Sequence, residues 1–99
     1  MNFSEFSLHD ARLIMLRALA DETDYTLNET LLAKVLEMHG HRRGRDFVRD
    51  QLRWMADEVG AVSFIEAGTV MIGTITRRGL DHVKQRVVIE GINRPSPGA

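Results

Sequence analysis

The sequence predicts a mostly α-helical fold with one small β-hairpin. Apolar residues recur at helical spacing in three segments up to Gly60, and two β-rich runs joined by a glycine-containing link follow them. A fourth segment with helical spacing comes after the β-rich runs. The length of 99 residues is that of one domain.

The first predicted helix starts at Ser7 and reaches an acidic connector at residues 21–26. Ser7 is suited to N-capping, and Asp10 three residues later makes a capping-box-like pair with it. The apolar residues of this segment are Leu13, Ile14, Met15, Leu16, Ala18, Leu19 and Ala20. They cover more than one side of the helix, which predicts burial in the core or against a second copy of the chain.

A short polar turn, "HGHRRG", separates the second and third predicted helices. Asn28 is expected to cap the second helix, and Gly40 to end it in a left-handed conformation. The third helix is expected between Gly44 and Gly60, where apolar residues keep helical spacing at Val48, Leu52, Met55 and Val59.

The second half of the chain predicts the hairpin and a last helix. The runs at 61–66 and 69–75 are β-rich, and the two residues between them include Gly68. Thr76 is placed to cap a helix over 77–85. Residues 88–99 are apolar and then rich in Pro and Gly, so we expect a domain over 1–87 and an extended C-terminal tail over 88–99.

Composition excludes several functional classes. The chain has no cysteine, which rules out disulfides, thiolate catalysis and cysteine-ligated zinc. We interpret His39 and His41 as turn residues and expect no metal site. No catalytic or phosphate-binding motif is present, so we expect no enzyme, no cofactor and no small-molecule effector. The acidic amino terminus lacks an export signal and no segment could cross a membrane, which predicts a cytoplasmic protein.

The formal net charge of −1 conceals two basic patches. Residues 1–40 carry three basic and seven acidic side chains, whereas residues 41–53 carry five basic and two acidic ones. Residues 76–86 form the second patch, with Arg77, Arg78, Lys84 and Arg86 against Asp81. Interactions with an anionic partner are therefore expected at these patches.

Three helices, a two-stranded antiparallel hairpin and a final helix follow the order of a winged helix-turn-helix domain. The turn at "HGHRRG" matches the connection of a helix-turn-helix pair, and "TITRRGLDH" resembles the strand-to-helix pattern of ArsR, MarR and PadR regulators. This resemblance covers nearly the whole chain and implies a DNA-binding protein. More narrowly, the segment 28–62 together with "IEGINRPSPG" resembles small winged-helix proteins encoded by Mu-like phages and prophages.

The resemblance implies that the third helix enters the major groove of double-stranded DNA. Subtracting its apolar stripe leaves an arginine-rich outer face, and the candidate DNA contacts are Arg42, Arg43, Arg45, Arg49 and Arg53. Arginine can bind guanine bidentately or anchor a phosphate. We expect Arg45 and Arg49 to read bases, in a phage or prophage transcriptional regulator.

An ordinary solvated helix face remains open as an alternative. Asp46 could pair with Arg49, and Asp50 with Arg53, at three-residue spacing. Glu66 lies at the expected tip of the wing, where a phosphate contact would require Arg or Lys. The second interpretation is therefore a winged-helix module that binds protein in phage assembly or host interaction, without DNA.

Two further expectations concern partners. Arg77 and Arg78 could contact phosphates that flank a DNA site, although a solvated helix face explains them as well. The surplus apolar residues of the first helix and the run "VVIEGI" in the tail would be exposed in a single small domain. They predict a homodimer.

Overall fold

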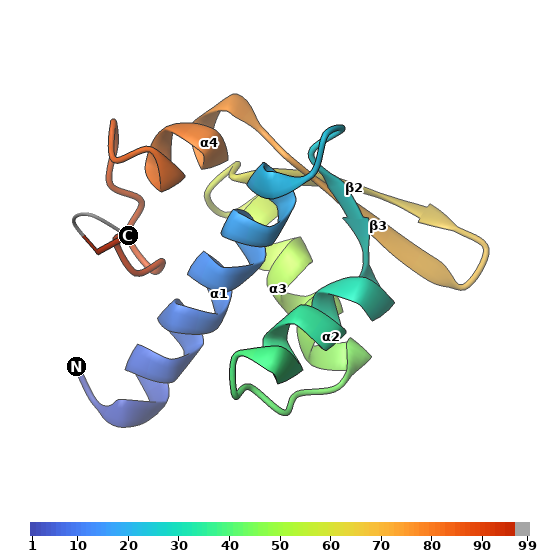
Figure 1. Cartoon of the computed structure of the whole chain (residues 1–99), viewed down its shortest axis with the longest axis horizontal. Helices are drawn as coiled ribbons and strands as arrows, with labels where there is room; N and C mark the ends of the chain where they lie inside the picture. Colours follow the sequence, from blue (N-terminus) through green and yellow to red (C-terminus); the bar gives the residue numbers. More distant parts are fainter. Residues whose placement is uncertain (97–99) are drawn as a thin grey trace.

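The computed structural model describes residues 1–96 of the 99-residue chain. Its elements follow in the order α1 (Phe3–Asp21), β1 (Thr26–Asn28), α2 (Glu29–Met38), α3 (Arg45–Asp57), β2 (Val62–Ala67), β3 (Val70–Ile75) and α4 (Arg77–Val83). The chain thus combines four helices with a small three-stranded sheet, whose β2–β3 hairpin extends past α2 and α3 (Figure 1). The expected mostly α-helical fold with a hairpin is present, with one additional strand.

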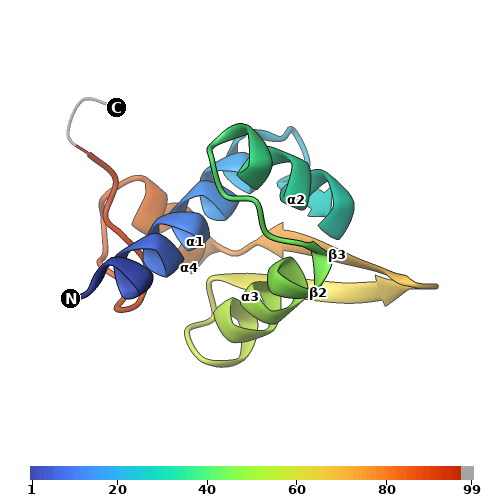
Figure 2. The same cartoon turned by 90° about the horizontal axis from the view of Figure 1, so that it is seen from below.

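The sheet is antiparallel throughout, and β3 lies in its centre in the order β1-β3-β2. The hairpin pairs Ala67 with Val70, so its turn is Gly68–Thr69, one residue later than expected. Gly68 has a φ of 63°, which glycine adopts without strain at the first central position of such a turn. Figure 2 shows α3 alongside this hairpin, whose turn projects beyond the helices.

The strand β1 was not expected from the sequence. It has only three residues and passes directly into α2 at Asn28, so no alternating pattern could develop. Thr26 and Thr74 pair across β1 and β3, and their hydroxyl oxygens lie 2.9 Å apart. The acidic connector therefore returns the chain to the sheet before α2 begins.

The apolar stripes of the helices converge on one core. From α1, it contains Leu13, Met15, Leu16 and Leu19, and α2 and α3 add Leu32, Leu36, Val48, Leu52 and Met55. Met71 and Ile75 of β3 close the core on the side of the sheet. The multiple apolar sides of α1 are thus largely buried within the chain itself.

The helix caps were predicted with mixed success. Asn28 and Thr76 cap α2 and α4 through their side chains, as expected, accepting hydrogen bonds from Leu31 N–H and Gly79 N–H. The cap of α1, in contrast, is Asn2 and not Ser7. The first turns of α1 carry the exposed Phe3 and Phe6 in place of a buried stripe, so the core-facing pattern begins later than the helix.

The expected extended tail differs from the structure over residues 88–96. Ile89 and Ile92 are buried in the core, and Asn93 N–H donates to the carbonyl of His9 on α1 at 3.2 Å. The buried ring of His82 accepts from Ile89 N–H and contacts Asn93 O at 2.8 Å. These residues therefore belong to the same body as residues 1–87, and residues 97–99 of the expected tail lie outside the described part of the chain.

Among residues 1–96, no helix combines the length and apolar character needed to cross a membrane.

Candidate functional site

The turn before α3 is held in place by its histidine. His41 N–H donates to Leu36 O at 2.8 Å, and the His41 ring contacts the Asp10 carboxylate of α1 at 2.8 Å. Gly40, with a φ of 88°, allows the reversal of the chain at this point. The turn is thus fixed to both α1 and α2 although its surface faces solvent.

Two of the five candidate arginines extend from this fixed turn. Arg42 and Arg43 are exposed, and neither forms an ion pair within residues 1–96. The guanidinium of Arg43 lies over the ring of Phe47, 4.5 Å from its centroid. Such stacking orients a guanidinium and leaves its N–H groups free to bind an anion.

Arg45, at the start of α3, is tied to a carboxylate in the protein interior. Its Nε donates to Glu29 Oε2 at 3.1 Å, and the Glu29 side chain is completely buried. The other oxygen of Glu29 accepts a hydrogen bond from Met71 N–H of β3. Glu29 therefore connects α2, α3 and the sheet, while about half of the Arg45 side chain remains exposed.

Arg49 and Arg53 are paired with the hairpin. Glu66 Oε1 accepts from Arg49 Nη2 at 3.1 Å and lies 3.7 Å from Arg53 Nη2. Arg49 Nε also lies 3.9 Å from Glu29 Oε1. Only 26% of the Arg49 side chain is exposed, so this residue is less accessible than the sequence suggested.

The structure contains one of the two ion pairs that the solvated-face interpretation offered. Arg53 Nη1 lies 3.6 Å from Asp50 Oδ1, whereas the structure pairs Arg49 with Glu29 and Glu66 and not with Asp46. Glu66 lies within β2, before the Gly68–Thr69 turn, and its carboxylate neutralises arginines of α3. The five arginines thus divide into a free group before α3 and a paired group along it.

Arg77 and Arg78 lie at the far end of α3 from this turn. Arg78 Nε donates to Val59 O at 2.8 Å, just beyond the last turn of α3. Arg77 Nε lies 3.3 Å from the Asp81 carboxylate, which Arg86 also contacts at 3.3 Å. The 13 residues of α3, about 20 Å of helix, therefore lie between Arg78 and the turn that carries Arg42 and Arg43.

The side chain of Arg12 is a structural anchor that sequence reasoning did not find. Arg12 is buried in α1, donates to Gln51 Oε1 and to Gly91 O at 2.8 Å each, and stacks 3.7 Å from the centroid of Trp54. Burial lowers the pKa of Arg12, yet guanidinium groups remain charged in proteins. Arg12 joins α1, α3 and the 88–96 segment.

The histidines serve structural contacts. The Nδ1 atom of His39 lies 2.9 Å from Val35 O, His41 binds Asp10, and His82 holds the 88–96 segment. Within the described residues, no three His, Asp or Glu side chains are grouped to hold a metal ion.

Comparison with known proteins relates the chain to one phage protein and one bacterial protein. It is 36% identical over 90 residues to the uncharacterized protein gp26 of Escherichia phage Mu, covering 91% of this chain and 92% of that protein. It is also 35% identical over 81 residues to an uncharacterized protein of Haemophilus influenzae, covering 81% of this chain and 78% of the relative. No family model matches the chain, and no solved structure matches it significantly.

The extent and identity of the first match define a family of small α+β proteins, and the chain belongs to it. This is the family of gp26 of phage Mu. The relationship provides the link to a phage, whereas the resemblance to ArsR, MarR and PadR regulators stays a prediction.

Proposed function

We propose that this protein is a winged-helix DNA-binding protein, and that it acts as a transcriptional regulator in a phage or prophage. The order helix, strand, helix, helix, strand, strand, helix supports the winged-helix assignment. In this assignment α2 and α3 form the helix-turn-helix pair and β2–β3 form the wing. The phage Mu relative supports the phage context.

One observation carries the DNA-binding proposal: the exposed Arg42 and Arg43 lie on a fixed turn directly before α3. Side chains at this position reach DNA phosphates when the amino end of α3 enters a major groove. Arg45 begins α3 and is half exposed, so it is the candidate base reader that remains accessible. Arg49 and Arg53 would contact DNA only after a phosphate of the DNA displaces the Glu66 carboxylate as their ion-pair partner.

The test is fluorescence anisotropy with a random 30-base-pair duplex at 50 and 200 mM salt. Two phosphate contacts per chain, at Arg42 and Arg43, predict an affinity that falls about 12-fold between these concentrations. The double variant Arg42→Ala/Arg43→Ala should reduce the slope of log affinity against log salt by about 2. The matched control, Arg17→Ala/Arg94→Ala, removes the same charge from α1 and from the 88–96 segment, outside both basic patches. Equal losses in both variants would contradict a specific role for the turn.

A second variant tests the pairing with the wing. Glu66→Gln releases Arg49 and Arg53 and removes a negative charge near the proposed DNA surface. We expect DNA to bind several-fold to about tenfold more tightly at 50 mM salt, because like charge at an interface opposes association. Glu90→Gln, an exposed carboxylate on the 88–96 segment, controls for net charge. An unchanged affinity in Glu66→Gln would show that the outer face of α3 does not meet DNA.

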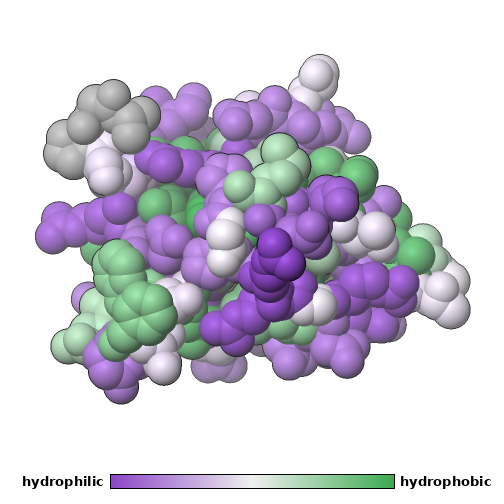
Figure 3. Space-filling model, turned by 60° about the horizontal axis from the view of Figure 1, so that its bottom comes forward, coloured by the Kyte–Doolittle hydropathy of each residue, from purple (hydrophilic) through white to green (hydrophobic). Residues whose placement is uncertain are grey.

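A second candidate function is protein binding without DNA. The pairing of Arg49 and Arg53 with Glu66 leaves the outer face of α3 with little free positive charge. In the space-filling view, hydrophilic side chains dominate the middle of the lower face, and hydrophobic ones gather mainly at its left and right margins (Figure 3). Absence of binding to the duplex even at 50 mM salt would favour this alternative.

A further inference from the structure

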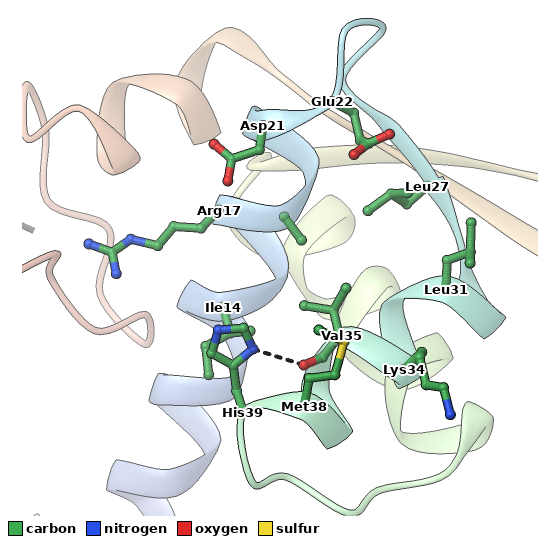
Figure 4. A pocket seen from close by; sticks show the side chains of 11 residues that line it. Ile14, Arg17, Asp21, Glu22, Leu27, Leu31, Lys34, Val35, Met38 and His39 are labelled. Atoms are coloured by element: carbon green, nitrogen blue, oxygen red, sulfur yellow. Dashed lines mark hydrogen bonds between the residues drawn. The ribbon is translucent and has the colours of Figure 1, made fainter.

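An apolar groove of about 630 Å³ opens between α1, β1 and α2. Its walls are formed by aliphatic side chains and a methionine: Ile14, Ala18, Leu27, Leu31, Val35 and Met38. Figure 4 shows Asp21 and Glu22 at one end of the groove and Met38 and His39 at the other. Leu31 and Met38 are 49% and 76% exposed, so the groove presents apolar surface to solvent.

A second hollow lies beside α1, closer to the amino end of this helix. Its lining includes Phe3, Phe6, Asp10, Arg42 and Arg43, and it shares His39 with the groove. Phe3 and Phe6 are 82% and 52% exposed.

Helical periodicity places the two features on one face of α1. Positions 3, 6, 10 and 14 follow each other at three- and four-residue spacing. Two exposed aromatic rings and an apolar groove thus lie along one helix face. At 1.5 Å per residue, Phe6 lies about 12 Å from Ile14 and about 18 Å from Ala18 along the helix axis.

We propose that this face binds a second copy of the same chain. A two-fold arrangement with antiparallel α1 helices would insert Phe3 and Phe6 of each copy into the groove of the other. With the axis beside Asp10, Phe6 lies level with Ile14 of the second copy, and Phe3 lies level with Arg17 of the second copy, one residue before Ala18. An isologous interface requires such self-complementarity within one surface patch.

Charge is compatible with the same arrangement. The groove contains Asp21 and Glu22 together with Arg17 and Lys34, and the hollow contains Arg42 and Arg43 beside Asp10. Because both linings are of mixed charge, the apolar contact of Phe3 and Phe6 with the groove holds the dimer, and Arg42 and Arg43 are not required for it. The proposal does not rest on DNA binding.

The test is sedimentation equilibrium without DNA, at protein concentrations from about 1 to 100 µM. We expect a reversible dimer with a micromolar dissociation constant, as small interfaces give. Phe3→Ala/Phe6→Ala and, separately, Met38→Glu should each weaken the dimer by about tenfold or more. Ile65→Ala, a 65% exposed position on β2, is the matched control and should leave it unchanged. Because these side chains are exposed, circular dichroism should show an intact fold in every variant.

Mixing the two weakened variants distinguishes this geometry from other dimers. A heterodimer of Phe3→Ala/Phe6→Ala with Met38→Glu keeps one intact aromatic-to-groove contact, so it should form more tightly than either variant alone. Since the chain has no cysteine, Asp10→Cys should give a disulfide-linked dimer under mild oxidation, and Asp50→Cys on α3 should not. A monomer at all concentrations, or a dimer insensitive to both α1 and α2 variants, would overturn the proposal.

Discussion

Replacing Arg12 by alanine should lower the free energy of unfolding by about 3 kcal/mol. The change removes two hydrogen bonds of 2.8 Å and leaves Gln51 Oε1 and Gly91 O without their partner. It also removes the guanidinium that stacks on Trp54 at 3.7 Å, so part of the loss is packing. The shift in the urea midpoint, read by far-ultraviolet circular dichroism, measures the effect.

Arg12→Lys is the matched control for this prediction. Lysine keeps the positive charge but cannot donate to Gln51 and Gly91 as a planar fork. If charge alone mattered, the lysine variant would be as stable as the wild type; we expect it to recover less than half of the loss. Hydrogen exchange should also accelerate at residues 89–93 in Arg12→Ala, because the segment loses its attachment to α1.

The second large effect is expected at Glu29. Glu29→Ala should reduce the free energy of unfolding by about 2 to 3 kcal/mol, because it leaves the buried Met71 N–H without an acceptor and removes the ion-pair partner of Arg45. The cost stays below that of a fully buried ion pair, since half of the Arg45 side chain is solvated. Urea unfolding again provides the measurement.

Glu29→Gln separates the hydrogen bond from the charge. The amide oxygen of glutamine can still accept from Met71 N–H, so this variant should lose clearly less stability than Glu29→Ala. Equal destabilisation by both substitutions would mean that the ion pairs with Arg45 and Arg49 carry the effect. Glu37→Ala, an exposed position on the same helix, should stay within about 0.5 kcal/mol of the wild type.

The helices and the hairpin could be predicted because their signals are local. Apolar spacing and caps such as Asn28 and Thr76 depend on residues three or four apart, and the structure confirms these two caps. The strand β1 could not be predicted, because its extended conformation comes from pairing with β3 and not from its own three residues. The start of α1 was missed since Phe3 and Phe6 extend the helix without extending the buried stripe.

The arginines of the candidate site were identified from the sequence, but their pairing was not. Glu29 and Glu66 are 16 and 17 residues away from Arg45 and Arg49 along the chain, so only the packing of α2 and β2 on α3 brings them together. Residues 88–96 present the same difficulty. Their apolar run predicts burial, but the sequence does not specify whether their own α1 or another molecule buries them.

The contact between α1 and residues 88–96 also has a consequence for how the chain folds. Arg12 and Gly91 are 79 residues apart, and His9 and Asn93 are even farther apart along the chain, so these contacts close a loop nearly as long as the described chain. Long-range closure slows folding because its entropic cost comes before its stabilising contacts form. On the ribosome, α1 emerges before residues 88–96, so the contacts of Arg12 with Gly91 and of His9 with Asn93 form only after this segment has been synthesised.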